Sequence, residues 1–294
     1  MPGRGSARGV GVRASDASAT LEDIAAQSAL KMGGENFPVA LRVLPAGPRD
    51  QLARVYAYAR FVDDVGDTAA GDRLALLDQI EADVRGLWGG GARLPAVVGL
   101  GPVVDACGIP PDPFVALIEA NRVDQRTSGY ETFDDLLGYC QLSAAPVGRI
   151  VLHIAGVATT ANVADSDAVC AALQILEHCQ DVGEDARAGR IYLPAADLRE
   201  VGVTDDDLLA PTTCPGLRRA VAVQVGRSDE LLGAGRELLR RLSGWPRIAV
   251  SGYVAGGLAT AEALRAARYH VLERIVRPQK LRTVALATRL IVRP

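Results

Sequence analysis

Apolar residues recur every three or four positions along most of this chain, and that spacing restricts the fold to packed helices. Leu52, Val55 and Val62 repeat in this way, which places them on one face of a helix. The alternation of apolar and polar residues that is typical of strands never persists. Glycines and prolines interrupt the pattern, as in the three glycines at 89–91. The sequence therefore predicts an all-α chain.

The same spacing gives approximate bounds for the helices. We expect helices over 20–32, from 48 to the acidic motif at 63–67, and over 72–88, 95–107, 111–126, 132–157, 165–187, 216–243 and 246–276. Three prolines make 188–215 a long irregular connection. Residues 1–19 are rich in Gly, Arg, Ser and Ala and are expected to form a flexible tail, so 20–294 forms one domain.

Composition narrows the class of protein. Aromatic residues make up only 4% of the 294 residues, so Leu, Val and Ala fill the core, which favours helices over a β-sandwich. The net charge of −3 argues against a nucleic-acid binder. Five cysteines without a C-x-x-C pair indicate reduced thiols in the cytoplasm. The longest uncharged stretches are too short to cross a bilayer.

Two acidic motifs carry the strongest chemical signal. Asp63 and Asp67 are four residues apart, and so are Asp181 and Asp185, so each pair lies on one helical face. Glu177 extends the second face by one turn. Facing pairs of hard oxygen ligands suit Mg²⁺ that is completed by phosphate oxygens. One such pair is more often a solvated acidic face, but two copies favour a metal site.

Arginines accompany both acidic pairs. Arg60 lies one turn before Asp63, and Arg187 and Arg190 follow Asp185. Arginine binds phosphate oxygens in a bidentate manner, so the mixture of cations and carboxylates fits a metal-bound diphosphate. The alternative for each arginine alone is a surface salt bridge.

Other catalytic motifs are absent or out of context. His153, His178 and His270 lack zinc-ligand spacing and are interpreted as ordinary core or surface histidines. A relaxed G-x-G-x-x-A at 9–14 follows no strand, so it is discounted as a nucleotide site. The sequence thus shows no site for NADPH.

Several segments together resemble the squalene and phytoene synthases. Residues 60–67 resemble the first aspartate-rich motif of that family, and 180–194 resemble the second. Tyr139–Cys140 with 143–148 is similar to the family's Tyr-Cys helix, and 269–274 more loosely resembles its last helix. The resemblance covers roughly residues 30 to 290 and implies an isoprenoid-synthase-type helical bundle with a central apolar cavity.

One segment points to a branch of the family. Residues 34–40, Gly-Glu-Asn-Phe-Pro-Val-Ala, resemble the opening of the bacterial hydroxysqualene synthases. This branch implies conversion of presqualene diphosphate and water to hydroxysqualene and diphosphate, in squalene and hopanoid biosynthesis. The implied cofactor is Mg²⁺, with Mn²⁺ as a substitute, and no NADPH is expected.

The resemblance also implies roles for particular residues. The expected metal ligands are Asp63, Asp67, Asp181 and Asp185. The expected substrate-binding residues are Arg60, Phe37, Gln180 and Arg274. The residues expected at the reacting centre are Tyr139, Asp124 and Arg190. The tunnel for the hydrocarbon chain is expected to be lined mostly by Leu, Val and Ala, with little cation–π shielding of a carbocation.

Several of these residues also have a purely structural interpretation. Tyr139 could be a packed core tyrosine, Asp124 a surface carboxylate beside Arg122 and Arg126, and Phe37 a core residue. At Glu177 the chain departs from the family, which usually has Asn there. Its carboxylate either joins the metal site or turns aside to an arginine.

Two other functions remain open at this point. The first is a head-to-head synthase that makes presqualene diphosphate, squalene or phytoene from two prenyl diphosphates. The second is a non-catalytic helical paralogue that binds a lipid or a partner protein. The lipid substrate implies peripheral contact with the inner membrane and coupling to the enzymes before and after it in the pathway. The arginine-rich region 265–293 fits either such contact or an ordinary solvated surface.

Overall fold

The computed structural model describes residues 21, 23–24 and 44–293. The expected tail, most of the helix expected over 20–32, the segment 34–40 and Phe37 lie outside the described residues. Within that part of the chain the backbone is helical and contains no β-strand, apart from one isolated bridge between Gly129 and Ile191. The all-α prediction is confirmed.

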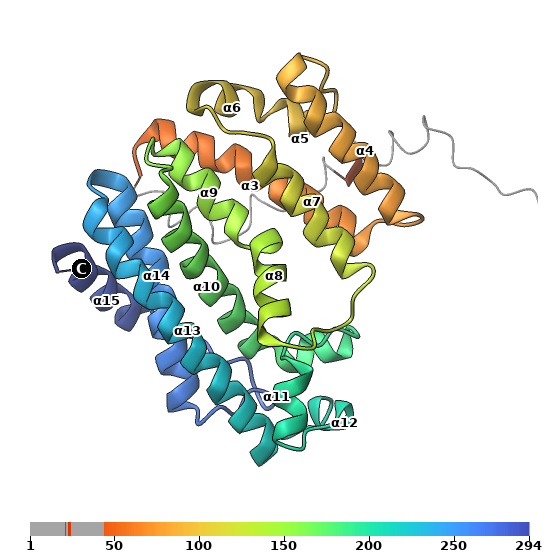
Figure 1. Cartoon of the computed structure of the whole chain (residues 1–294), viewed down its shortest axis with the longest axis vertical. Coiled ribbons are helices and arrows are strands. Elements are labelled where there is room, and N and C mark those ends of the chain that lie inside the picture. Colours follow the sequence, from red (N-terminus) through yellow and green to blue (C-terminus); the bar gives the residue numbers. More distant parts are fainter. Residues whose placement is uncertain (1–20, 22, 25–43, 294) are drawn as a thin grey trace, which may run out of the picture.

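The helices follow one another along the chain as labelled in Figure 1. Their bounds are α3 Ala46–Thr68, α4 Arg73–Gly86, the 3-10 turn η1 Leu87–Gly89, α5 Pro95–Val98, α6 Gly101–Cys107, α7 Asp112–Asp124, α8 Phe133–Ser143, α9 Ala145–Ile154, α10 Thr160–Arg187, α11 Ala195–Glu200, α12 Asp205–Leu208, α13 Pro215–Arg241, α14 Gly244–Ala266 and α15 Lys280–Val292.

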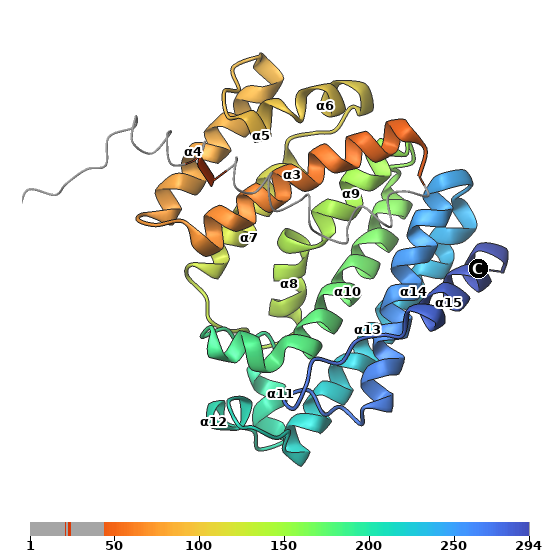
Figure 2. The ribbon, with the colours of Figure 1, turned by 180° about the vertical axis from the view of Figure 1, so that it is seen from behind.

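The longest helix, α10, runs through the middle of the molecule (Figures 1 and 2). It packs against α13, α14, α8 and α9. α7 packs against α3, α4 and α8, and α15 packs against α14. No helix in the described ranges is long and apolar enough to cross a bilayer.

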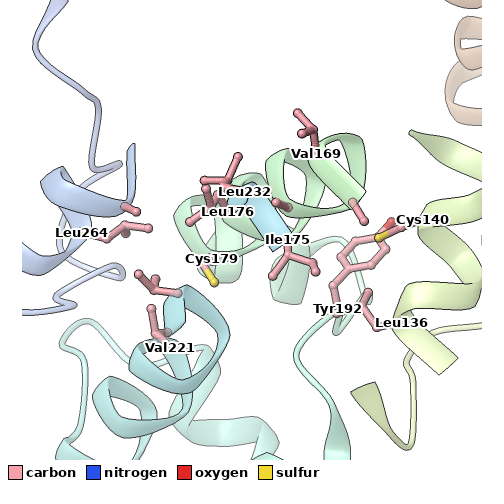
Figure 3. Packing of buried hydrophobic residues seen from close by; sticks show 14 of the residues in the cluster. Leu136, Cys140, Val169, Ile175, Leu176, Cys179, Tyr192, Val221, Leu232 and Leu264 are labelled. Carbon is pink, nitrogen blue, oxygen red and sulfur yellow. The ribbon is translucent and has the colours of Figure 1, made fainter. Parts of the chain in front are cut away.

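Small residues allow the helices around α10 to approach closely. The buried face of α10 carries Val169, Ile175, Leu176 and Cys179 (Figure 3). A Cβ atom added at Gly235 of α13 would lie 2.7 Å from Val254 of α14, so only glycine fits there. The core is therefore built from aliphatic side chains and close helix contacts, as the low aromatic content predicts.

The helix bounds differ from the sequence prediction in several places. The helix expected over 95–107 is two helices, α5 and α6, and the helix expected over 165–187 begins at Thr160. The helix expected over 132–157 is broken at Ala144, because Pro146 lacks the N–H that would continue it. The helix expected over 246–276 ends at Ala266, since Arg268 and Tyr269 adopt positive φ and reverse the chain. The connection 188–215 contains two short helices, α11 and α12.

Arg122 joins α7 to α4 by a cluster of ion pairs. Its buried guanidinium donates to Asp78 at 2.6 Å, to Glu81 at 2.5 Å and to Glu119 at 3.2 Å. Replacing one partner of such a cluster leaves carboxylates facing one another without their cation. Arg122 therefore holds the helix that carries Asp124 against the rest of the fold.

We expect Arg122→Ala to lower the free energy of unfolding by about 2–4 kcal/mol. The matched control is Arg126→Ala, because Arg126 is exposed and reaches Glu119 only at 4.0 Å. That control should change stability by less than about 0.5 kcal/mol. Urea unfolding measures both variants, and equal losses would contradict the role given to Arg122.

Candidate active site

A cavity of about 370 Å³ lies among α3, α7, α8 and α10 and holds both aspartate pairs. Asp63 and Asp67 reach it from α3, and Asp181 and Asp185 reach it from α10. The structure thus brings together two pairs of side chains that are more than a hundred residues apart in sequence. The lining is mainly polar, so the apolar tunnel expected for a hydrocarbon stays a prediction.

The cavity concentrates negative charge in a partly enclosed space. Burial, with the charges of Asp67 and Asp64, raises the pKa of Asp63 from 3.8 to about 6, although Asn121 and Arg60 oppose the shift. Burial and the neighbouring Glu177 likewise raise the pKa of Asp181. A cation placed among these carboxylates would relieve their mutual repulsion.

The donor set fits a hard divalent cation that shares its coordination with a ligand. Asp63, Asp67, Asp181 and Asp185 present carboxylate oxygens to one cavity, the ligand type that Mg²⁺ prefers. Among residues 44–293 no three acidic, histidine or cysteine side chains converge closely enough to enclose a metal by themselves. Mg²⁺ usually keeps several waters and is completed by phosphate oxygens, so an open carboxylate set suits it.

Asn121 of α7 supports the first aspartate pair and was not predicted from the sequence. Its amide donates to Asp63 at 3.1 Å and to the Leu117 carbonyl at 3.1 Å. Gly66 leaves the space for this amide, because a Cβ atom there would lie 1.9 Å from the Asn121 oxygen. The glycine of the first acidic motif is therefore required by packing between α3 and α7.

We expect Gly66→Ala to push Asn121 away from Asp63 and to reduce turnover by about tenfold or more, since a hydrogen bond to a charged group contributes about 1.5–3 kcal/mol. The control is Gly226→Ala in α13, where an added Cβ meets nothing within 4 Å. It should preserve turnover and raise the melting temperature slightly. Full activity of Gly66→Ala would refute the packing argument.

Asp124 sits inside the cavity and accepts two phenolic hydrogen bonds. The Tyr139 hydroxyl donates to it at 2.8 Å and the Tyr192 hydroxyl at 3.3 Å. Burial raises the pKa of Asp124, and it also raises the pKa values of both phenols. Asp124 is thus not a surface carboxylate beside Arg122, whose guanidinium points to Asp78 and Glu81.

Aromatic rings gather around this carboxylate. His178 stacks on Tyr192 with ring centroids 3.7 Å apart and planes 10° apart. Tyr139 lies 5.6 Å from Tyr192 and 5.3 Å from Tyr130, centroid to centroid. The chain has few rings, but it places several of them at this cavity; the expectation of little cation–π shielding in the hydrocarbon tunnel stays a prediction. His178 lines the cavity, a position that its lack of zinc spacing did not reveal.

A turn after α10 brings Arg190 and Tyr192 to the site. Gly189 adopts a φ of +78°, a conformation that glycine allows without strain. The backbone N–H of the next residue, Arg190, donates to the Asp185 carbonyl at 2.9 Å. The backbone N–H of Ile191 donates to the Ser128 carbonyl at 2.7 Å. These contacts lay the segment beside the α7–α8 connection and direct Tyr192 toward Asp124.

The predicted arginines occupy different positions. Arg190 lines the cavity and reaches Asp67 at 3.3 Å. Arg60 lies beside the cavity, 3.4 Å from Asp64. Arg274 lines a separate cavity of about 470 Å³ near the start of α15. The structure thus brings Arg190 to the aspartates and leaves Arg274 elsewhere.

The structure also places Gln180 and Glu177, the other two site positions singled out from the sequence. Gln180 donates to the Val276 carbonyl and ties α10 to the segment before α15, so it does not line the cavity of the aspartates. Glu177 does line that cavity, and within residues 44–293 no arginine forms an ion pair with it. Among the described arginines, therefore, the structure shows none to which Glu177 turns aside.

Comparison with known proteins decides the family. The model of the squalene/phytoene synthase family matches residues 30–283. The chain belongs to this family. It is 38% identical over 208 residues to the hydroxysqualene synthase of Rhodopseudomonas palustris, covering 69% of this chain and 70% of that protein. It is 29% identical over 228 residues to the presqualene diphosphate synthase of the same organism, covering 73% and 79%.

A solved structure supports the same assignment. The squalene synthase HpnC from Alicyclobacillus acidocaldarius superposes with a TM-score of 0.77 at 39% identity, covering 86% of this chain and 98% of that one. This squalene/phytoene synthase family member is therefore an enzyme with the all-α isoprenoid synthase fold. The resemblance read from residues 60–67 and 180–194 is confirmed.

Proposed function

We propose that this enzyme converts presqualene diphosphate and water to hydroxysqualene and inorganic diphosphate with Mg²⁺. The observation that carries the proposal is the cavity in which both aspartate pairs face Arg190, Asp124 and Tyr139. Similarity to hydroxysqualene synthases supports it. The reaction transfers no hydride, so it needs no NADPH.

The metal ligands in this proposal are Asp63, Asp67, Asp181 and Asp185, with Glu177 as a further oxygen donor. When bound, Mg²⁺ supplies Lewis-acid stabilisation of the departing diphosphate. Burial, and after it the charges of neighbouring carboxylates, raise the pKa values of Asp63 and Asp181, and a bound cation would offset both effects. Arg190, which reaches Asp67 at 3.3 Å, neutralises further charge on the leaving group.

Tyr139 and Asp124 orient the attacking water and accept its proton. The carbon–oxygen bond to diphosphate breaks and diphosphate keeps the electron pair, after which a water oxygen bonds to the carbocation. The Tyr139 hydroxyl orients this water, and Asp124 receives its proton through that hydroxyl. The raised pKa of Asp124 makes it a better proton acceptor than an exposed aspartate. The ring faces of Tyr139 and Tyr192 stabilise the cation until water attacks.

The product formed from presqualene diphosphate, identified by mass, tests the proposal. We expect hydroxysqualene when the enzyme receives presqualene diphosphate and Mg²⁺ without NADPH. We expect no product from farnesyl diphosphate alone. Turnover of farnesyl diphosphate would instead establish the head-to-head synthase, and no turnover of either substrate would favour the non-catalytic paralogue.

The proposed substrate and product place the enzyme between two reaction classes. A prenyl transferase that joins two allylic diphosphates must supply the cyclopropylcarbinyl diphosphate. A reductase must remove the allylic hydroxyl that this enzyme introduces. Both the substrate and the product carry long hydrocarbon chains, so we also propose that the enzyme works in peripheral contact with a membrane.

A further inference from the structure

The outer face of α15 carries an apolar stripe. Its members are Leu281, Val284, Ala285, Thr288 and Val292, and all five are exposed. Leu281 is 86% exposed, Val292 69% and Val284 62%. At 3.6 residues per turn the stripe covers roughly 100° of the helix, and Leu286 and Leu290 are buried on the other side. α15 lies at the outer edge of the molecule, against α14 (Figures 1 and 2).

Positive charge surrounds this stripe. Residues 274–293 contain six cationic residues and no acidic one, although the whole chain has a net charge of −3; subtracting +6 leaves −9 for the rest. In helical register Lys280 lies on one flank of the stripe, and Arg289 lies on the other. Arg282 is paired with Glu262 of α14 at 2.7 Å. Lys280 and Arg289 form no ion pair with any described residue.

A groove with similar chemistry adjoins the start of α15. The cavity of about 470 Å³ is lined by alanines of α14, including Ala259, Ala263 and Ala266, by Arg274 and Arg277, and by the ion pair of Arg282 with Glu262. A lining that combines alanines with two guanidinium groups suits an amphiphile with a phosphate head. The cationic residues of this groove and those beside the stripe all come from residues 274–289.

We infer that α15 docks this enzyme on an anionic phospholipid bilayer, with the helix axis parallel to the surface. The apolar stripe would enter the boundary between head groups and acyl chains, while Lys280 and Arg289 contact lipid phosphates. A second copy of the chain is a poorer occupant, because two-fold pairing of α15 would bring like charges together. The inference does not depend on which diphosphate the enzyme consumes.

Flotation of the purified full chain with lipid vesicles tests this inference without any substrate. We expect the protein to float with vesicles of phosphatidylcholine and phosphatidylglycerol, and not with phosphatidylcholine alone. Added salt should weaken the binding. The double variant Leu281→Asp/Val284→Asp should lower the partition coefficient at least about tenfold, and Lys280→Glu/Arg289→Glu should do the same.

The matched control places the same new charges on another exposed apolar surface. Leu209→Asp/Val223→Asp changes residues that are 51% and 44% exposed and should leave flotation unchanged. Failure of the unmodified chain to float would overturn the inference. Equal flotation of Leu281→Asp/Val284→Asp and the control Leu209→Asp/Val223→Asp would also overturn it. A dimer in light scattering that Leu281→Asp/Val284→Asp dissolves would also overturn it, because the stripe would then be a contact between copies. Vesicle binding without turnover would leave the docking intact and refute only the proposed reaction.

Discussion

Asp63→Asn is expected to abolish turnover, by about 10³-fold or more, and also to stabilise the metal-free enzyme. The side chain loses a charged metal ligand, so catalysis fails. The same carboxylate is unfavourable in the empty cavity, because burial raises its pKa from 3.8 to about 6. At pH 7.5 the wild-type protein must keep this group ionised in the folded state, whereas asparagine carries no charge. We expect a gain of only about 1 kcal/mol, since the side chain opens onto the cavity and is screened by water.

The pH dependence of this gain has a definite sign. The folded state holds the Asp63 proton more tightly than the unfolded chain, so wild-type stability rises relative to the variant as pH falls through about 6. The advantage of Asp63→Asn should therefore shrink below pH 6 and vanish near the ordinary aspartate value of 3.8. Proton competition should likewise weaken Mg²⁺ binding to the wild-type enzyme as pH falls through 6.

Thermal melts with and without Mg²⁺, together with turnover, measure these effects. Mg²⁺ should raise the melting temperature of the wild type and should have much less effect on Asp63→Asn. The control Asp134→Asn removes an exposed carboxylate of α8 and should keep both turnover and the Mg²⁺ response. An active Asp63→Asn enzyme, or one that still responds fully to Mg²⁺, would show that Asp63 is not a metal ligand.

The sequence predicted the parts of this structure that depend on local spacing. Asp63 and Asp67, and Asp181 and Asp185, share helical faces because residues four apart are neighbours on any helix. The helical class follows from the same periodicity. The bounds failed where one residue changed the backbone, as at Pro146 and Arg268.

Contacts between residues far apart in the sequence could not be predicted from local spacing. Asn121 meets Asp63 only because α7 packs on α3, and His178 meets Tyr192 only because the chain turns at Gly189. The one local signal for Asn121 was its position three residues before Asp124, which places both on one face of α7. Arg274 illustrates the converse, since a motif match gave it a site role but the chain directs it to another groove.

Tyr139→Phe is expected to change the fate of the carbocation more than the rate of its formation. The substitution keeps the ring and removes only the hydroxyl that donates to Asp124 at 2.8 Å. The Tyr192 hydroxyl still donates to Asp124 at 3.3 Å, so the carboxylate keeps one of its two phenolic hydrogen bonds. Diphosphate release should continue, while the fraction of product that is hydroxysqualene should fall about tenfold or more, since a charge-assisted hydrogen bond contributes about 1.5–3 kcal/mol.

Tyr130→Phe supplies the matched control from the same aromatic cluster. The Tyr130 ring lies 5.3 Å from the Tyr139 ring, but its buried hydroxyl has no hydrogen-bond partner among the described residues. Removing that hydroxyl should leave the product unchanged and stabilise the fold slightly, because a buried unsatisfied polar group is unfavourable. Diphosphate release and product mass distinguish the proposed orientation of water by Tyr139 from binding of the diphosphate by the same hydroxyl. If Tyr139 orients diphosphate instead of water, Tyr139→Phe will raise KM and leave the product composition as it is in the wild type.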